Sequence, residues 1–528
     1  MQKLKKKIFY LFLFIFFVIG SIASLDVGIS HDEWHEEENW KYNVNIAKNL
    51  KSEIFNPKED KLILDSYKDK YYGIGFQIIS QPIQSLIKEL LVEFENISPF
   101  GAKLTSKHFV VFLFFFISGL CFFLMLKKII NNTNFCYFSL IIYFSYPYLF
   151  GQSLFSPKDI PFMSVWIICT FLSFNVFEKL LKNKNLTYKK IFLFSLLTAF
   201  LLSIRVTGVL IFFQYLITLI IFLNTDKMTF NYFVKKFYLK LLTFIFFVCF
   251  FVYIFYPLYW SNPLTIVNAI KWMGHYYHDV CTNTLGTCMD AKNLPPTYIP
   301  IWLSVKLPII ILLGIFLIPF TEKKIFTNKK NKIFFGTILL TSILIPLILI
   351  FRNVHLYDEI RHIMFLMPFF FILGTVSLYI FSKKFFYLLG ILSVSIFIFE
   401  NIKIHPYQYV WFNLPSRYID LTKKFELEYQ GVSGKEIAEK ISLMEDKELC
   451  VLGSPDYSFK PYLKSNRFNC IDKWQLIDTD YPRPFLAVQH VRNIKKGMPY
   501  NCKSIYDAGF NLLFHNSRFI TGKLLKCF

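Results

Sequence analysis

The first residues that could do chemistry form an acidic, histidine-containing run, Ser30-His-Asp-Glu-Trp-His-Glu-Glu-Glu38, which follows a long apolar stretch. Within this run, Asp32 and Glu33 lie close to apolar chain, where a reduced dielectric can keep a carboxylate as a base or let it hold a hydroxyl group. The alternative is a solvated acidic helix start, which the helix dipole favours.

The same run also suggests a metal site. His31 and His35 lie four residues apart and would share one face of a helix. Their spacing is not the His-Glu-x-x-His pattern of zinc enzymes, and the sequence offers no clear third ligand. We therefore predict that no cofactor is required, and we keep a divalent metal at His31 and His35 as the alternative.

A second candidate group lies in Phe155-Ser-Pro-Lys-Asp-Ile-Pro161, between two apolar stretches. Pro161 suits the first turn of the helix that would follow. Lys158 and Asp159 would then sit at the start of that helix. Such a charged pair can anchor the chain at a membrane interface, or it can hold a sugar or a phosphate.

Arginine usage marks a third group. Lys outnumbers Arg by 50 to 8, and the first 400 residues contain only Arg205, Arg352 and Arg361. Arginine differs from lysine in its planar fork, which binds phosphate and carboxylate through two parallel hydrogen bonds. Arg361 and His362 also precede an apolar stretch whose helix start adds a favourable dipole for an anion. The alternative is a weak surface ion pair between Arg361 and the two acids just before it.

The elements that must position these residues are membrane helices. Of the 528 residues, 54% are hydrophobic, 20% aromatic and only 18% charged, against roughly 25% charge in soluble domains. About 20 apolar residues cross a bilayer as a helix. The sequence predicts a polytopic α-helical membrane protein with about eleven transmembrane helices, over residues 8–25, 108–126, 134–150, 160–177, 190–204, 206–223, 241–258, 299–320, 333–351, 363–381 and 385–400.

Lysine placement predicts the orientation of these helices. The formal net charge of +22 could suggest nucleic-acid binding, but lysine clusters occupy alternate connections, as the positive-inside rule requires. We expect a cytoplasmic amino terminus in a bacterial plasma membrane and an uncleaved first helix; a cleaved signal peptide is the alternative. Residues 191–223 are too long for one span and have lysines at both ends, so two short helices turning at Arg205 are expected.

The predicted domains follow from these spans. Residues 1–400 form the transmembrane domain, with outer loops 26–107 and 259–298, and residues 401–528 form a small α/β extracytoplasmic domain. In that last domain Ser433-Gly-Lys-Glu436 has the pattern of a capping box opening a helix over 435–444, and Cys450-Val-Leu reads as a strand.

Cysteine placement fits the same map. Six cysteines lie in the predicted outer regions, where an oxidising compartment allows disulfides, and six free thiols are the alternative. Cys281 and Cys288 share one loop, but the pairing of the four in the C-terminal domain cannot be read from the sequence: Cys450, Cys470, Cys502 and Cys527.

In this order and on this side of the membrane, the motifs resemble the C-type glycosyltransferase fold. The closest likeness is to the protein O-mannosyltransferases and lipid A aminoarabinose transferases, with their bacterial relatives. It is carried by Asp32-Glu33, Ser156-Pro-Lys-Asp159-Ile-Pro, Ser203-Ile-Arg205 and Ile360-Arg-His362, and by the segments 294–302 and 405–413. The resemblance covers roughly residues 30–420.

The resemblance implies an inverting transfer of a sugar from a polyprenyl-phosphate donor to a hydroxyl acceptor on the periplasmic face. By that likeness Asp32 is the general base with Glu33 supporting it, and Lys158 and Asp159 line the donor–acceptor cavity. The donor phosphate would be held by Arg205, Arg361 and His362. The physics agrees, because a leaving phosphate needs placed cations and a hydroxyl needs one carboxylate.

Three rival functions fit the sequence less well. The first is a transporter of an anionic or lipid-linked substrate, which would place its polar groups near mid-membrane, whereas here they gather on one face. The second is a polysaccharide ligase or polymerase that uses diphosphate-linked donors, and the third is a non-catalytic membrane scaffold with a secreted domain. The sequence does not reveal which sugar is transferred or the oligomeric state. It also does not reveal whether the acceptor is a lipid, a glycan or a protein.

Overall fold

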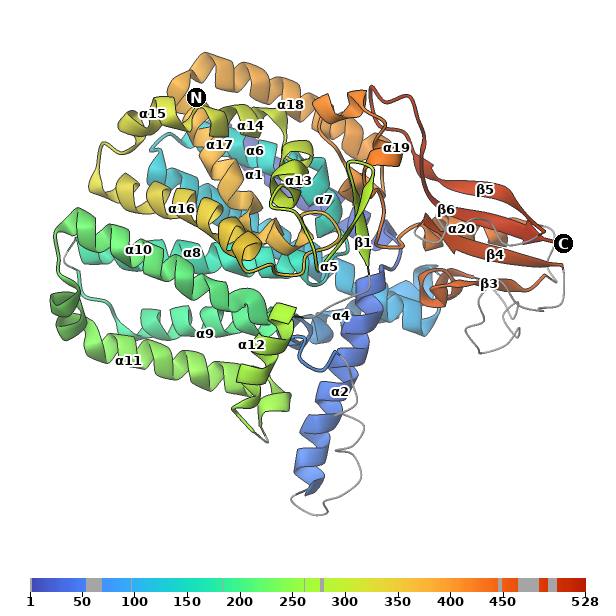
Figure 1. Cartoon of the computed structure of the whole chain (residues 1–528), viewed down its shortest axis with the longest axis horizontal. Helices are drawn as coiled ribbons and strands as arrows, with labels where there is room; N and C mark the ends of the chain where they lie inside the picture. The colour runs from blue at the N-terminus through green and yellow to red at the C-terminus, as the bar shows by residue number, and fades with distance from the viewer. Residues whose placement is uncertain are drawn as a thin grey trace.

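The chain is a polytopic, mainly helical membrane protein with a small sheet domain at one end, as the computed structural model in Figure 1 shows. The residues described are 2–53, 69–95, 97–182, 184–260, 262–275, 280–444, 449–463, 484–491 and 501–528. Within these ranges, eight helical segments are long and apolar enough to cross a membrane. They are α1 (Gln2–Asp26), α5 (Pro99–Ile129), α8 (Asp159–Leu181), η1 (Val206–Val209) with α10 (Leu210–Asp226), α11 (Phe230–Phe255), α16 (Lys329–Phe351), η3 (Arg361–Leu366) with α17 (Met367–Phe381), and α18 (Lys383–Lys403).

The remaining three predicted spans are helical but shorter or broken. Residues 134–150 divide into α6 (Thr133–Ser145) and α7 (Pro147–Ser153), and 190–204 form the 17-residue α9 (Tyr188–Ile204). Residues 299–320 divide into α13 (Tyr298–Lys306), α14 (Ile309–Phe316) and α15 (Ile318–Ile325). The breaks fall at Pro147, Pro308 and Pro319, because proline lacks the amide hydrogen that a continuing helix needs. The prediction that residues 134–150 and 299–320 each form one unbroken helix is therefore wrong.

The predicted reversal at Arg205 is confirmed. Helix α9 ends at Ile204, Arg205 is extended with φ −145° and ψ 133°, and the short helix η1 leads into α10. Gly73 packs against this turn so closely that an added Cβ would lie 2.1 Å from the carbonyl oxygen of Ser203. Two short helices thus present one arginine between them, at the end of the bundle.

The predicted outer loops, residues 26–107 and 259–298, fold over that same end. Residues 26–107 contain α2 (His31–Glu53) and α4 (Gly75–Glu95), with residues 54–68 outside the described ranges. Residues 259–298 contain α12 (Thr265–His275) and a hairpin of β1 (Cys281–Thr284) and β2 (Thr287–Asp290). Leu285 and Gly286 turn the hairpin with positive φ angles of 54° and 87°. A Cys281–Cys288 disulfide closes it, which confirms that the two cysteines pair.

The C-terminal region joins the bundle through short helices: η4 (Gln408–Val410), η5 (Pro415–Tyr418) and α19 (Leu421–Lys424). A four-stranded sheet follows in the order β3 (Val451–Ser454), β4 (Phe485–His490), β6 (Phe519–Cys527) and β5 (Cys502–Phe510). The β3–β4 pair is parallel and the others are antiparallel. The strand expected after Cys450 is therefore present as β3.

Disulfides cross-link this domain. Cys502 pairs with Cys527, and Cys450 is also disulfide-bonded. Cys470 lies outside the described residues. Cys121, Cys136, Cys169 and Cys249, all in predicted spans, are free thiols. Among the described residues, the cysteines thus divide as expected between free thiols in the helices and disulfides in the 281–288 hairpin and the C-terminal domain.

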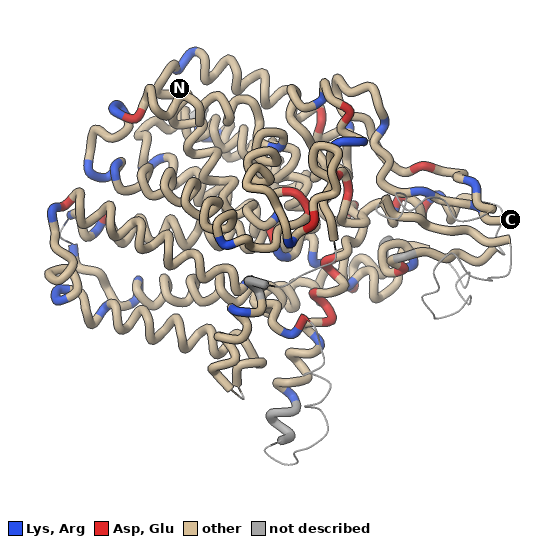
Figure 2. Tube along the Cα trace, in the orientation of Figure 1, with Lys and Arg blue, Asp and Glu red and all other residues tan. Residues whose placement is uncertain are grey.

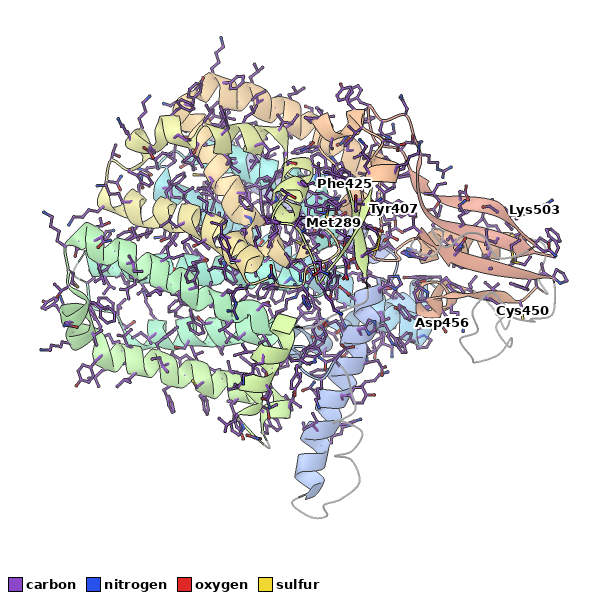
Figure 3. The ribbon with its side chains drawn as sticks, viewed as in Figure 1. Met289, Tyr407, Phe425, Cys450, Asp456 and Lys503 are labelled. Carbon is purple, nitrogen blue, oxygen red and sulfur yellow. A yellow bond between two sulfur atoms is a disulfide. The ribbon has the colours of Figure 1, made fainter. Side chains whose placement is uncertain are left out.

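Helix α20 (Gly434–Ser442) covers one face of the sheet, but it does not begin with the predicted capping box. Ser433 makes no side-chain cap, because its hydroxyl instead donates to the Thr521 carbonyl. The Glu436 carboxylate accepts hydrogen bonds from the hydroxyls of Tyr407 and Tyr506. Tyr407 lies where the bundle meets the sheet, with Cys450 and Lys503 farther out, as Figure 3 shows. The two residues of the motif therefore fasten α20 to β5, β6 and the segment of Tyr407 rather than cap the helix.

The charges divide between the two ends of the bundle. Figure 2 shows lysines at the helix ends farthest from the sheet, whereas acidic residues gather where the bundle, α2 and the sheet domain meet. The lysine-rich connections thus share one end, as the predicted topology requires. The residues with candidate chemistry lie at the other end.

Candidate functional site

A cavity of about 450 Å³ opens where the end of the bundle that carries Arg205 meets α2 and the C-terminal domain. Its walls combine cationic, acidic and aromatic side chains. The predicted site residues that line it are His31, Asp32, His35, Lys158, Arg205, Arg361 and His362. The fold therefore brings together, in one cavity, residues from four segments that are far apart in the sequence.

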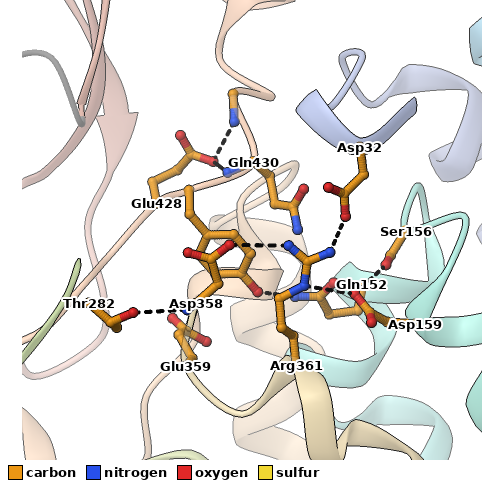
Figure 4. A network of polar contacts seen from close by, with 12 residues as sticks. Asp32, Gln152, Ser156, Asp159, Thr282, Asp358, Glu359, Arg361, Glu428 and Gln430 are labelled. Atoms are coloured by element: carbon orange, nitrogen blue, oxygen red, sulfur yellow. Dashed lines mark hydrogen bonds and ion pairs between the residues drawn. The ribbon is translucent and has the colours of Figure 1, made fainter. Parts of the chain in front are cut away.

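Arg361 is the centre of the charged network in Figure 4. Its Nη2 donates to a carboxylate oxygen of Asp32, its Nη1 to Asp358 Oδ2 at 3.1 Å, and its Nε to Asp159 Oδ2 at 3.3 Å. The Arg361 side chain is only 7% exposed. The acids just before Arg361 were weighed as an exposed partner, but the Asp358–Arg361 pair is buried, and burial makes its geometry far more consequential.

Asp159 lies behind the arginines rather than on the cavity wall. Its side chain is fully buried, and Oδ1 pairs with Arg205 Nη2 at 2.5 Å while Oδ2 accepts from Arg361. One carboxylate therefore fixes the positions of both guanidinium groups. Arg205 is 11% exposed and remains open to the cavity. Arg352, the third arginine of the first 400 residues, follows the end of α16, is exposed, and does not line the cavity.

Lys158 lies between a carboxylate and an aromatic ring. Its Nζ is 2.5 Å from Glu36 Oε1 and 3.7 Å from the ring centroid of Tyr72. The side chain is 8% exposed, with its ammonium enclosed between the carboxylate and the ring face. Lys158 thus adds a third cation to the wall that Arg205 and Arg361 form.

The acids of α2 divide between two roles. Three of them, Glu33, Glu36 and Glu37, point inward at helical spacing and pair with buried groups. Glu33 accepts from the Ser30 amide at 2.6 Å and contacts His108 Nε2 at 2.7 Å, so it fastens the start of α2 to α5. Glu33 is fully buried and does not line the cavity, whereas Asp32 does.

Asp32 is held as a carboxylate. Burial acts to raise its pKa, but the positive charges of Arg361, Lys158 and Arg205 outweigh burial and hold the pKa well below its usual range. Its side chain is 20% exposed, more than that of Asp159 or Asp358. Among the three acids around Arg361, Asp32 is therefore the one most accessible to a ligand.

The turn that carries Arg361 is strained. Asp358 and Glu359 both have left-handed backbones, with φ angles of 56° and 65°, which cost free energy in residues other than glycine. The surroundings hold this turn: the Asp358 amide donates to Thr282 Oγ1 at 2.9 Å, and the Tyr298 hydroxyl donates to the Glu359 carbonyl at 3.1 Å. The disulfide-closed hairpin therefore helps to position Arg361.

His362 and Tyr357 line the cavity beside this turn. Their rings pack edge to face with centroids 4.7 Å apart. Burial raises the pKa of Tyr357 to about 12, so its phenol is neutral and can donate a hydrogen bond. The histidine predicted to act with Arg361 is thus next to it in the cavity, together with a phenol that the sequence did not single out.

The metal alternative has little support in the geometry. His31 and His35 both line the cavity, but within the described residues no group of three His, Cys, Asp or Glu side chains is placed to hold a metal ion. His31 Nδ1 instead lies 3.1 Å from the hydroxyl of Tyr457.

The C-terminal domain contributes cavity residues that sequence reasoning missed. Tyr429, Tyr457 and His490 line the cavity, and Glu428 is buried behind His490. Each is an isolated residue without a local motif. Only the fold brings Tyr429 to Arg361, whose guanidinium carbon lies 5.8 Å from the ring centroid. The sequence pointed to these residues only through composition. His490 and the Glu428-Tyr429 pair lie in the only predicted domain with the composition of a soluble protein.

This arrangement can bind an anion and activate a hydroxyl. Three cations converge on one region and suit a phosphate, because arginine forks match its oxygens. One accessible carboxylate, Asp32, lies in contact with them and can accept a proton.

Comparison with known proteins gives a fold-level likeness only. No family model matches the chain, and no curated protein matches it. Among solved structures, ArnT from Cupriavidus metallidurans in the apo state is 11% identical, with a TM-score of 0.43, and the match covers 84% of this chain and 87% of that one. ArnT from the same organism bound to undecaprenyl phosphate is 10% identical, with a TM-score of 0.42 and coverage of 86% and 92%. At these identities and TM-scores, the function must be inferred from the residues of this chain.

Proposed function

We propose that this protein is an integral-membrane glycosyltransferase that moves a sugar from a polyprenyl-phosphate donor to a hydroxyl acceptor. The observation that carries the proposal is the direct contact, in one cavity at the end of the helical bundle, of an accessible carboxylate, Asp32, with a buried arginine, Arg361. The reaction needs both groups: a base for the acceptor and a cation for the leaving group.

The donor phosphate is assigned to the cationic wall. Arg205, Arg361 and Lys158 provide its charges, and Tyr357 and His362 provide hydrogen-bonding groups beside them. The cavity volume of about 450 Å³ lies within the range of small-ligand sites and is large enough for a sugar with its phosphate. The prenyl chain would leave the cavity toward the lipid.

The phosphate must displace a carboxylate to reach Arg361. That guanidinium already contacts Asp32, Asp159 and Asp358, of which the last two are nearly or fully buried. Asp32 is the partner that can be exchanged. When the phosphate takes its place, Asp32 loses its strongest cationic neighbour, its pKa rises, and it becomes a better base.

The transfer is then a single displacement with inversion. The acceptor oxygen forms a bond to the anomeric carbon, its proton passes to Asp32, and the bond from that carbon to the phosphate oxygen breaks. The polyprenyl phosphate leaves with the bonding electron pair, and Arg205 and Arg361 stabilise its charge. Asp159 acts through the two arginines as a positioning residue.

The proposal is tested by the fate of lipid-linked sugars in cells. A strain lacking the gene should accumulate a polyprenyl-phosphate-linked sugar, which mass spectrometry detects, and the wild-type gene should remove it. Asp32→Asn and Arg361→Ala should fail to remove it although both proteins reach the membrane in normal amounts.

A matched control lies at the other end of the bundle. Lys128 pairs with Glu178, far from the cavity, and Lys128→Ala should clear the lipid as the wild type does. If Asp32→Asn and Arg361→Ala clear it normally, the site is wrong. If Lys128→Ala fails while the cavity variants work, a transporter fits better than a transferase.

A further inference from the structure

The C-terminal domain reaches the cavity through His490, the last residue of strand β4. The imidazole is 6% exposed and is one of the cavity-lining groups. Its Nε2 contacts the carboxylate of Glu428, which comes from the segment that joins the bundle to the sheet. The contact links two elements separated by 62 residues and ends at the wall of the cavity.

Glu428 is built to orient this histidine. Its side chain is fully buried, and Oε1 accepts hydrogen bonds from the Tyr409 hydroxyl at 2.8 Å and the amides of Gln430 and Gly431 at 2.6 and 2.8 Å. Figure 4 shows Glu428 beside Gln430, next to the Arg361 network. Because Glu428 presents a carboxylate to Nε2, that nitrogen donates a hydrogen bond to it, and the tautomer that this contact selects leaves Nδ1 as an acceptor.

Two more rings extend this surface. His31 packs edge to face on His490 with centroids 5.0 Å apart, and its Nδ1 contacts the Tyr457 hydroxyl at 3.1 Å. Tyr457 in turn stacks on Trp34 at 5.3 Å with the rings nearly parallel. Gly431 makes room for His31, because an added Cβ would lie 2.9 Å from its Nε2. We call His31, Tyr457 and His490 the ring wall.

The ring wall differs in chemistry from the cationic wall. Its members are flat rings with one hydrogen-bonding edge each, whereas Arg205, Arg361 and Lys158 are charged. Flat rings with polar edges suit the apolar faces and spaced hydroxyls of a neutral sugar, and the ring wall contains none of the three cations assigned to the phosphate. His31, Asp32 and Tyr457 line the same cavity, and the charge of Asp32 acts on the Tyr457 phenol, so the ring wall lies near the predicted base.

Resting on the proposed glycosyltransferase function, we propose that the ring wall is the acceptor site and that the acceptor is a neutral carbohydrate. His490, held by Glu428, accepts a hydrogen bond through Nδ1 from an acceptor hydroxyl and positions the neighbouring hydroxyl at Asp32. The C-terminal domain therefore selects the acceptor, while the membrane domain binds the donor.

One substitution of His490 should weaken acceptor binding without disturbing the contact that holds the domain together. In His490→Gln the side-chain amide takes the place of Nε2 and keeps a donor for Glu428, but it has no atom at the place of Nδ1. His490→Ala removes both. Glu436→Gln is the matched control, because Glu436 is also a carboxylate that accepts tyrosine hydroxyls at the domain junction but does not line this cavity.

The assay uses full-length protein in liposomes made with lipid extract from the deletion strain, which supplies the accumulated donor. Neutral oligosaccharides released from the envelope of that strain are the acceptor probe, and its envelope proteins are the comparison. Transfer is followed by donor consumption, and donor-site integrity by the Kd for polyprenyl phosphate.

For His490→Gln we expect the half-saturating oligosaccharide concentration to rise about tenfold, the effect of losing one good hydrogen bond. The maximal rate and the Kd for polyprenyl phosphate should stay near wild type, as should every parameter of Glu436→Gln. A merely structural role of His490 would leave the Gln variant unaffected, or would weaken phosphate binding as well, and either result overturns the proposal.

Two outcomes separate this inference from the proposed function. If the wild type consumes the donor with the protein fraction but not with the oligosaccharides, the function stands and the carbohydrate acceptor is refuted. If the wild type consumes no donor with either fraction, the glycosyltransferase proposal itself fails, and the acceptor site falls with it.

Discussion

Asp32 and Arg361 are 329 residues apart in the sequence and form an ion pair at the cavity wall. The pair joins the predicted base to the arginine that is predicted to bind the donor phosphate. Before the donor binds, Asp32 therefore occupies the phosphate-binding edge of Arg361, and Arg361 lowers the basicity of Asp32. Arg361 keeps two buried carboxylates, Asp159 and Asp358, when Asp32 leaves it. Its position is therefore fixed while its cavity-facing edge can change partner.

This exchange makes an unusual prediction for Asp32→Asn. The variant should lose transfer, because an amide cannot accept the proton, yet it should bind polyprenyl phosphate about tenfold more tightly, because the phosphate no longer competes with a carboxylate. Titration of purified protein with polyprenyl phosphate measures the change. Arg361→Lys provides the opposite case: it keeps the charge but loses the fork, and it should bind more weakly. Weaker binding by Asp32→Asn would show that the two groups do not compete.

The neighbouring acid should behave quite differently. Glu33 and His108 are both fully buried and 2.7 Å apart, so His108→Ala leaves a carboxylate buried without this partner. Breaking such a pair costs about 3–5 kcal/mol, which should lower the thermal midpoint in detergent by several degrees. Lys41→Ala, which breaks the exposed Glu38–Lys41 pair of the same helix, should leave the midpoint unchanged. Equal midpoints for both variants would refute the structural role given to Glu33 and His108.

The sequence predicted the parts of this site that depend on sidedness and residue type. Arg205 could be placed at a turn because lysines at both ends of 191–223 require two crossings. Arg361 stood out because arginine is rare in the first 400 residues. Both inferences depend on residue type and on which side of the membrane a connection lies. Neither depends on how the helices pack against one another.

The sequence could not predict which charged residue would be buried. Asp159 and Lys158 are adjacent, yet one is fully buried behind two arginines and the other lines the cavity. In the same way, Asp32 faces the cavity and Glu33 faces α5. These differences depend on helix rotation and on long-range packing, which local spacing does not fix. The proline breaks at 147 and 308, in contrast, were visible in the sequence and should have divided two of the predicted spans.

The hairpin at the cavity gives a third prediction. Thr282 accepts a hydrogen bond from the Asp358 amide within a left-handed turn, so Thr282→Val leaves a strained turn without one of its restraints. We expect polyprenyl phosphate to bind several-fold more weakly because Arg361 is less well placed. Thr287→Val changes the exposed side of the same hairpin and should bind as the wild type does. If the two variants bind alike, the hairpin does not position Arg361.

The junction that holds His490 should show a defined pH dependence. Burial acts to raise the pKa of Glu428, but His490, Tyr409 and His31 outweigh burial and lower it to about 2, below the ordinary value of 4.5. A carboxyl with a depressed pKa stabilises the folded state above its unfolded pKa, and this stabilisation is lost as the pH falls from about 4.5 toward about 2. Glu428→Gln, which has no such group, should therefore be less stable than wild type by a few kcal/mol at pH 6–7, and the difference in thermal midpoint should shrink below about pH 4.5. Glu436→Gln, measured over the same pH range, controls for loss of a carboxylate at the domain junction. A Glu428→Gln difference that stays constant from pH 7 to pH 3 would mean that the ionised carboxylate does not hold this junction together.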